Sequence, residues 1–425
     1  MRYSIKNATE QQVKQSGGQN LRVLKSMKVV YADLTPEQAK ILERAGCKVQ
    51  PIADVSSFSG LESISVGQIA PPPIPTITPA GPTLTPAEVV EATGFNEFWT
   101  MCNPPLVGKW FNVALIDTGI RKTHEALGDV VYEKDYTTDG NTDDGFNHGT
   151  GVASIIHAVA PMAGILNLKV IDSLGNGTDE LVAAALDDII TMYDNQDPLT
   201  PCIINMSVGG PDDLDPENIM REACREAAAR GIWLFAAAGN YGPVGTTITM
   251  PANEGCVCAV GSINYDPFIV ADYSSRGPTP EGLIKPDVCM FGSNMRLASS
   301  TGDNSYVTKS GTSFACPYVA GLGCLVFEGI VRGAEAQGFL SNLLTGSMIL
   351  PKMDYVIGNM MPQICVKPDD VDLDKDNFYG YGLAFGPLAK AQFAAQANNM
   401  VDAMKIAMPA FMMSAFAMAL PVKVG

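Results

Sequence analysis

Histidine is scarce in this sequence, because its 425 residues include only His124, His148 and His157. A metal site built on histidines is hard to assemble from so few, and we expect no required metal or other cofactor. Nucleophilic catalysis needs just one histidine, between a carboxylate and a hydroxyl. Basic residues are also few, with 28 Lys and Arg against 45 Asp and Glu and a net charge of −17. Because nucleic-acid binders usually present a basic surface, no nucleic-acid partner is expected.

Targeting segments and disulfide patterns are also missing from the sequence. The first residues have no apolar core of a signal peptide, and no apolar run has the length of a clean transmembrane helix. Ten scattered cysteines are no disulfide scaffold, and most stand inside apolar runs, which predicts buried free thiols. We therefore expect a cytoplasmic location, with export by another route left open.

The first 60 residues differ in charge from the rest. They carry 9 Lys and Arg and 5 Asp and Glu, a net charge of +4, which leaves −21 for the remainder. This asymmetry is either chance or the sign of a small α+β segment docked in cis on an acidic body. Residues 1–20 are polar and expected to be mobile. Residues 21–53 are predicted to form strand, helix and strand, with a capping box from Thr35 to Gln38.

The remainder divides into three parts. Residues 61–85 form a Pro-rich linker, and a capping box at its end predicts a helix that runs to about Trp99. In residues 86–395, short apolar runs rich in Val and Ile alternate with helical stretches. That alternation predicts an α/β domain of three layers, with a mostly parallel sheet between helices. Residues 396–425 form a Met-rich apolar tail, predicted to pack on the body or to contact a partner or a membrane surface.

Four short segments carry side chains suited to nucleophilic catalysis. Asp117 follows the apolar run VALI, at the end of a predicted strand, where parallel sheets place their functional groups. His148 is followed by small residues, which let a helix begin close to a neighbour. Ser313 opens a predicted helix, whose unpaired N–H groups favour a developing anion. Asn240 follows a buried run, and its amide can donate to an oxyanion.

Together these segments resemble the subtilisin-like serine proteases, or subtilases. The resemblance rests on four blocks in the order that the family uses: Ile116-Asp117-Thr118-Gly119, His148-Gly149-Thr150, Ala238-Gly239-Asn240 and Gly311-Thr312-Ser313. Residues 204–210 resemble the strand that lines the family's primary specificity pocket, and residues 172–178 the strand that pairs with substrate backbone. The resemblance covers roughly residues 86–395.

The resemblance implies a subtilisin-like fold and a serine endopeptidase that hydrolyses polypeptides, made as a zymogen that processes itself. It implies Asp117, His148 and Ser313 as the catalytic triad, with Asn240 in the oxyanion hole. The substrate-binding residues that it implies are Leu174, Gly175, Asn176, Gly177, Ser207, Val208, Gly209, Ala237, Ala238, Gly239 and Thr312. Residues 21–60 resemble half of an inhibitor-type propeptide, so the segment 1–60 is expected to be a partner in cis.

The sequence also departs from the family pattern. Cys316 stands where threonine is usual, one helical turn after Ser313, and is expected to make the site thiol-sensitive. The calcium loop of secreted bacterial members is absent, and the acidic run 369–377 lacks the glycine and glutamate of an EF-hand, so calcium is possible but unsupported. The alternative hypothesis is an interaction or assembly protein of the same fold that cleaves only itself or is inactive.

Overall fold

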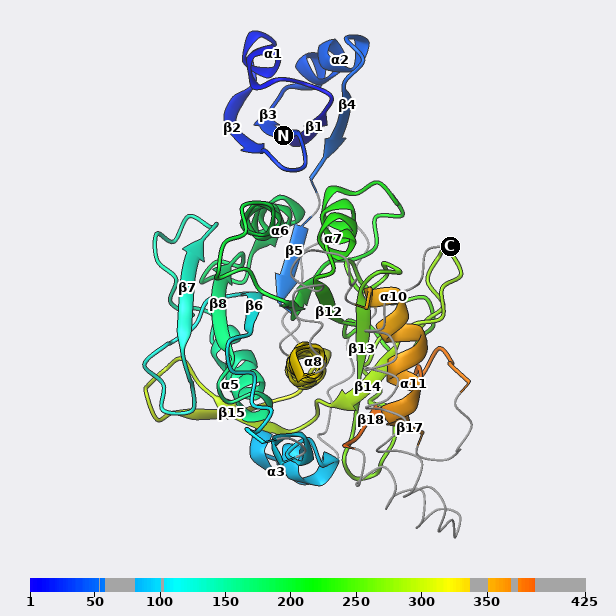
Figure 1. Cartoon of the computed structure of the whole chain (residues 1–425). Coiled ribbons are helices and arrows are strands. Elements are labelled where there is room, and N and C mark those ends of the chain that lie inside the picture. The colour runs from blue at the N-terminus through cyan, green and yellow to red at the C-terminus, as the bar shows by residue number, and fades with distance from the viewer. Residues whose placement is uncertain (53, 58–80, 101–102, 337–350, 368–373, 387–425) are drawn as a thin grey trace, which may run out of the picture.

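The computed structural model describes residues 1–52, 54–57, 81–100, 103–336, 351–367 and 374–386. They form a small N-terminal domain and a large α/β domain (Figure 1). The tail predicted at 396–425 and most of the linker predicted at 61–85 lie outside the described residues.

The N-terminal domain is a four-stranded sheet with two helices. Its elements are β1 (Arg2–Lys6), α1 (Glu10–Gln15), β2 (Gln19–Leu24), β3 (Val29–Asp33), α2 (Pro36–Arg44) and β4 (Lys48–Pro51). The strand order is β2-β3-β1-β4, and all neighbours are antiparallel. The expectation that residues 1–20 are mobile is wrong. Ile5 and Val13 are fully buried in this domain's core, and Thr9 closes a capping box that the sequence analysis missed.

The central sheet of the large domain has the strand order β17-β18-β14-β13-β12-β10-β6-β8-β7 within the described residues. All its pairs are parallel except β17 with β18. The strands are β6 (Asn112–Asp117), β7 (Val130–Asp135), β8 (Gly164–Lys169), β10 (Ile203–Met206), β12 (Trp233–Ala237), β13 (Cys258–Ile263), β14 (Val288–Phe291), β17 (Cys365–Val366) and β18 (Leu383–Ala384).

Helices cover both faces of this sheet (Figure 1). The longer ones are α3 (Pro86–Thr93), α5 (Gly149–Val159), α6 (Asp179–Asp194), α7 (Ile219–Ala229) and α8 (Thr312–Ala336). Alternate residues of β6 join two different cores: Val113 and Leu115 pack with α3, α5 and α8, whereas Ala114 and Ile116 pack with α6 and α7. The α/β three-layer fold predicted from the sequence is confirmed.

Smaller elements complete the described part of this domain. They are α4 (Glu97–Thr100), β9 (Gly177–Thr178), β11 (Val208–Gly209), the hairpin of β15 (Met295–Ala298) and β16 (Tyr306–Lys309), and a helical stretch of α10 (Met353–Tyr355), Val356–Met360 and α11 (Met361–Ile364). The single helix predicted to run to Trp99 is wrong. Gly94 has a left-handed φ of 70° and ends α3, after which α4 begins at Glu97.

Helix α8 runs through the middle of the domain (Figure 1). Of the helices described, it is the one whose length and apolar composition would suffice to cross a membrane. Since 89% of its most apolar window is buried inside the protein, it is a core helix here.

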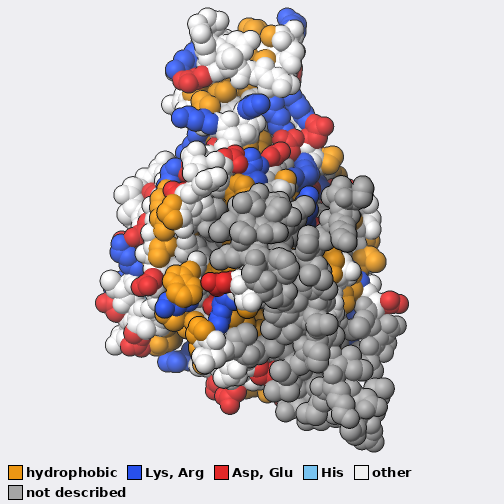
Figure 2. Space-filling view, viewed as in Figure 1, with side chains coloured by type: hydrophobic (Ala, Val, Ile, Leu, Met, Phe, Trp, Pro, Cys, Tyr) orange, Lys and Arg blue, Asp and Glu red, His pale blue; other side chains and the backbone are white. Residues whose placement is uncertain are grey.

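The N-terminal domain contacts α6 and α7 through ion pairs. The Glu180 carboxylate, in the first turn of α6, accepts hydrogen bonds from Arg2 Nε at 2.6 Å and Arg2 Nη2 at 2.7 Å. Arg22 Nε lies 3.4 Å from the same carboxylate, and Lys6 Nζ lies 2.5 Å from Glu222 Oε1 on α7. Figure 2 shows basic and acidic side chains gathered where the two domains meet. The opposite net charges of the two parts of the chain therefore meet at this junction.

Candidate active site

The four predicted catalytic segments converge on the carboxyl edge of the sheet. Strand β6 ends at Asp117, and Ser207 and Ala238 directly follow β10 and β12. Because neighbouring parallel strands end on the same side, these residues share one edge. Helix α5 begins just after His148, and α8 begins at Thr312.

Asp117 and His148 form a buried pair. His148 Nδ1 lies 2.6 Å from Asp117 Oδ1, and the two side chains are 0% and 1% exposed. The backbone N–H of Thr118 donates to the same oxygen at 2.8 Å. An aspartate that accepts at Nδ1 holds the proton on that nitrogen, which leaves Nε2 as a proton acceptor. His148 Nε2 is buried and has no hydrogen-bond partner among the described residues.

Glycines allow α5 to begin directly against the end of β6. A Cβ on Gly149 would lie 2.3 Å from the carbonyl oxygen of Gly119 and 3.0 Å from Asp117 Oδ1. Gly119 has a φ of 104°, in the left-handed region, and a Cβ there would lie 2.6 Å from the Asp143 carbonyl oxygen. The close approach that the small residues after His148 predicted is therefore present, and it brings the two side chains of the pair together.

The buried Asp144 carboxylate organises the start of α5, and the sequence analysis missed it. Its Oδ1 accepts the His148 N–H at 3.1 Å and the Thr118 hydroxyl at 2.7 Å. Its Oδ2 accepts the Thr150 N–H at 2.9 Å and the Thr150 hydroxyl at 2.6 Å. A carboxylate that satisfies N–H groups at a helix start both caps the helix and complements its dipole. The aspartate four residues before the histidine was the available signal.

Ser313 lies in the first turn of α8 and is fully buried. Its hydroxyl donates to the Ser207 carbonyl oxygen at 3.2 Å, and the Ser207 hydroxyl donates to the Ser313 carbonyl oxygen at 2.9 Å. The ring of the next residue, Phe314, lies 5.2 Å from the His148 ring, measured between centroids. The serine hydroxyl is thus directed to the segment that follows β10 and does not hydrogen-bond His148 Nε2, while the next residue packs on the histidine ring.

Asn240 is held by the start of α8. Its Oδ1 accepts from the backbone N–H and the hydroxyl of Thr312, both at 3.0 Å, and the same hydroxyl accepts the Gly239 N–H at 3.2 Å. These bonds fix the plane of the amide and the direction in which its Nδ2–H groups donate. Thr312, predicted to bind substrate, is here the residue that orients Asn240.

A short strand of the N-terminal part of the chain lies between the two segments predicted to bind substrate. Strand β5 (Asp54–Ser57) pairs antiparallel with β9 and with β11. Val55 pairs with Gly177, Ser56 with Gly209 and Ser57 with Val208. A polypeptide strand therefore occupies the position in which an extended peptide would add to these two edges.

The other residues predicted to bind substrate lie around this strand. Gly175 and Asn176 belong to the turn before β9, where the N–H groups of Leu174 and Asn176 donate to Asp172 Oδ1 at 2.9 and 2.8 Å. Leu174 is 79% exposed and outside the paired residues, whereas Thr178, which was not predicted, pairs with Asp54. Ala237 and Ala238 are fully buried at the end of β12.

The remaining histidines and Cys316 have structural surroundings. Ser305 O lies 2.7 Å from His124 Nε2, and Gly128 N–H donates to His157 Nδ1 at 3.0 Å. Cys316 is fully buried, and burial followed by the nearby Asp117 charge raises the pKa of its thiol well above the usual value. A buried, protonated thiol is unreactive, which argues against the expected thiol sensitivity. The residues that the structure describes contain no cluster of three or more His, Cys, Asp or Glu suited to a metal ion.

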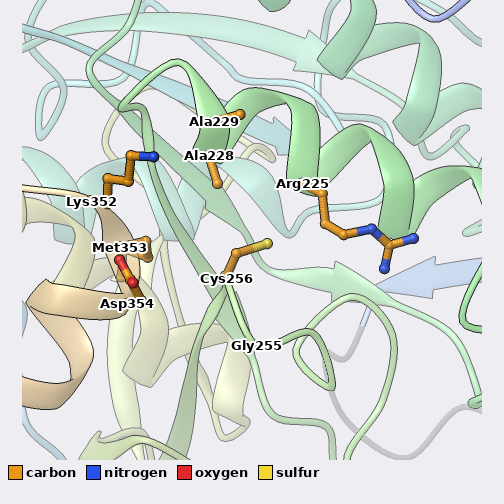
Figure 3. A pocket seen from close by; sticks show the side chains of 8 residues that line it. All are labelled: Arg225, Ala228, Ala229, Gly255, Cys256, Lys352, Met353 and Asp354. Atoms are coloured by element: carbon orange, nitrogen blue, oxygen red, sulfur yellow. The ribbon is translucent and has the colours of Figure 1, made fainter.

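A separate hollow of about 280 Å³ lies beside the C-terminal half of α7 (Figure 3). It is lined by Arg225, Ala228, Ala229, Gly255, Cys256, Lys352, Met353 and Asp354. Gly255 and Cys256 precede β13, so this hollow lies at the amino edge of the sheet, opposite Asp117 and His148. Burial raises the pKa of Cys256 to about 11, which keeps the thiol protonated. The hollow takes no part in the site described above.

Comparisons with known proteins identify the family of this chain. A profile of the subtilase family matches residues 108–382, about two thirds of the chain. Subtilisin DY of Bacillus licheniformis is 33% identical over 266 residues, which cover 59% of this chain and 84% of that protein. Serine protease AprX of Bacillus subtilis is 32% identical over 264 residues, which cover 52% of this chain and 58% of that protein. Proteinase T of Parengyodontium album is 31% identical over 53% of this chain and 72% of its own length.

The fold and the comparisons define a serine endopeptidase of the subtilisin type, a hydrolase that acts on polypeptides. The chain belongs to the subtilase family.

Proposed function

We propose that this endopeptidase works through Asp117, His148 and Ser313 and is made as a zymogen that cleaves itself. The observation that carries the catalytic proposal is the buried pair of His148 and Asp117, whose Nδ1 and Oδ1 atoms lie 2.6 Å apart. Ser313 at the start of α8 supplies the nucleophile, and its neighbour Phe314 touches the histidine ring.

The proposed reaction begins when the Ser313 hydroxyl leaves the Ser207 carbonyl and turns to His148 Nε2. Its oxygen attacks the carbonyl carbon of the substrate, and Nε2 takes the proton. Asp117 stabilises the imidazolium, which then gives the proton to the leaving amine as the C–N bond breaks. Water releases the acyl group from Ser313 by the same steps.

The negative charge on the attacked carbonyl oxygen needs fixed donors. The Asn240 amide, oriented by Thr312, and the Ser313 backbone N–H at the start of α8 are the proposed donors. Removal of one such donor costs about 3–4 kcal/mol in the activation barrier, a magnitude that was measured on subtilisin itself.

The zymogen proposal is supported by β5, which pairs with β9 and β11 while it remains connected to the N-terminal domain. A strand held in this position blocks other peptides from the same edges. The ion pairs of Arg2 and Arg22 with Glu180 hold the attached domain on α6.

The proposed domain division is the one predicted from the sequence, with the propeptide-like segment at 1–60. The cytoplasmic location stays a prediction from the sequence.

Intact mass spectrometry tests this function on purified wild type and Ser313→Ala, incubated with a denatured protein as substrate. Wild type is expected to lose the N-terminal segment and degrade the substrate, while Ser313→Ala stays full length and inactive. If wild type cleaves itself but not the substrate, the alternative of a self-cleaving assembly protein is favoured. If Ser313→Ala degrades the substrate as fast as wild type, the proposed nucleophile is wrong.

A further inference from the structure

Two cysteines from distant parts of the sequence meet in the large domain. Cys324 is fully buried in the middle of α8, and Cys202 stands at a bend directly before β10. Cys202 packs against the apolar core that contains Cys324, and a side-chain hydrogen bond joins the two thiols. The packing of α8 on the central sheet therefore brings two sulfur atoms into contact at the amino end of β10.

Cys202 is held in place by the strands on either side. Its N–H donates to the Asn112 carbonyl oxygen at 3.1 Å, and its carbonyl oxygen accepts the Trp233 N–H at 3.0 Å. Its thiol donates to the same Asn112 oxygen at 3.5 Å. These bonds connect Cys202 to β6 and β12, so the sulfur is presented from a fixed backbone.

Helix α8 comes close to the sheet next to both cysteines. A Cβ on Gly323 would lie 2.9 Å from Phe235 Cζ and 3.5 Å from Ile203 Cδ1. Gly323 directly precedes Cys324, and Ile203 directly follows Cys202. Because a disulfide requires two backbones only a few ångströms apart, a glycine at this contact favours a short link between the helix and the strand.

The two thiols differ in exposure. The hydrogen bond to Cys202, followed by burial, raises the pKa of the Cys324 thiol well above its usual value, so Cys324 keeps its proton. Cys202 is partly exposed, which lets a small oxidant reach its sulfur. A reachable cysteine beside a second, resolving cysteine is the arrangement that allows reversible oxidation.

We propose that Cys202 and Cys324 are a site of reversible oxidation by hydrogen peroxide, and that the disulfide they form fastens α8 to the central sheet. One peroxide oxygen bonds to the Cys202 sulfur as the O–O bond breaks, which gives a sulfenic acid and one water. The Cys324 sulfur then displaces the hydroxyl group, which leaves as a second water with the Cys324 proton. The two thiols lose two electrons in total, and the peroxide is reduced to two waters.

Cys224 and Cys256 are the main competing pair. Cys224 is buried in α7, and Cys256 lines the hollow shown in Figure 3. The Cys256 charge contributes to the raised pKa of Cys224. A charge acts over many ångströms, whereas a hydrogen bond requires contact, so the bond between Cys324 and Cys202 is the stronger indication of adjacent sulfurs.

Peptide mapping of the full chain tests the link. The Ser313→Ala protein is used to prevent self-digestion, and it is treated with hydrogen peroxide, alkylated in urea and digested without reduction. We expect a pair of peptides joined through Cys202 and Cys324, which separates on treatment with dithiothreitol. Full alkylation of both cysteines, or a link from either one to Cys102 or Cys256 in place of this pair, overturns the proposal.

Single variants in the same background test the order of the two steps. Cys324→Ser should leave a sulfenic acid on Cys202 that the reagent dimedone labels, whereas Cys202→Ser should give no link and no such label at Cys324. Cys224→Ser is the matched control, and the link should form in it as in the parent. Dimedone labelling of Cys324 in the Cys202→Ser protein would overturn the assignment of Cys202 as the first site of oxidation. The map of the parent protein decides whether the link forms even where a variant folds poorly.

Urea unfolding tests the second half of the proposal. The oxidised Ser313→Ala protein should unfold at a higher urea concentration than the reduced protein, because the link restricts the unfolded chain over a long loop. Dithiothreitol should restore the lower midpoint, and peroxide should not raise the midpoint of the Cys202→Ser protein. Equal midpoints for the linked and the reduced protein would refute the claim that the disulfide fastens α8 to the sheet.

Discussion

Removal of the Asp144 carboxylate should both destabilise the protein and slow its reaction. The Asp144→Ala change leaves the buried N–H groups of His148 and Thr150 without their acceptor. A buried donor without a partner costs about 1–3 kcal/mol, so for these two donors we expect the free energy of unfolding to fall by about 2–6 kcal/mol. Asp144→Asn keeps one accepting oxygen and should lose about half as much.

The same change should lower kcat more than it raises KM, because Asp144 positions His148 and belongs to neither β9 nor β11, the two strands proposed to bind the substrate backbone. A misplacement of about 1 Å commonly costs about 100-fold in rate. Unfolding is measured by urea titration in the Ser313→Ala background, where self-digestion is removed. Asp143→Ala is the control, since this neighbouring carboxylate is exposed, and it should change stability by less than about 0.5 kcal/mol. An Asp144→Ala protein as stable and as active as the Asp143→Ala control would refute the reasoning.

Three further changes test other parts of the structure. Glu180→Gln should weaken the binding free energy between the cleaved N-terminal fragment and the large domain by about 1–2 kcal/mol, since the Arg2 partner is partly exposed. Co-elution of the two fragments in size-exclusion chromatography at rising salt concentration measures this binding. Binding that does not depend on salt would contradict the prediction. Gly149→Ala should lower the free energy of unfolding by about 1–3 kcal/mol and slow peptide hydrolysis, because the new Cβ would clash with the Gly119 carbonyl oxygen. An unchanged melting temperature and an unchanged kcat would show that α5 can shift freely. Burial lowers the pKa of His157, whose Nδ1 accepts from the Gly128 N–H, so the unfolded chain binds a proton below about pH 6.5 that the folded protein does not, and stability falls as the pH drops through that value. His157→Gln should flatten this dependence of the melting temperature on pH between about pH 7.5 and 5. An identical slope in the variant would rule out His157 as its source.

Local patterns in the sequence predicted the elements that carry the site. The apolar runs before Asp117, Ser207 and Ala238 are strands of a parallel sheet, because a Val- and Ile-rich run without alternation must be buried on both faces. The capping box at Thr35 predicted the start of α2, since the side-chain bonds that form it lie within four residues. Where a non-local contact decides, the same reasoning failed. The polar residues 1–20 are ordered because β1 pairs with β3 and β4, which no local pattern shows.

The sequence by itself determined the family, the order of the catalytic segments and the layered α/β architecture, because each depends on short motifs or on the period of apolar residues. Only the tertiary structure placed β5 between β9 and β11, more than 120 residues away in each case. It alone also showed that Asp144 holds the histidine and that Glu180 holds the N-terminal domain. These contacts depend on which surfaces meet after folding, and residue type and spacing along the chain leave that choice open.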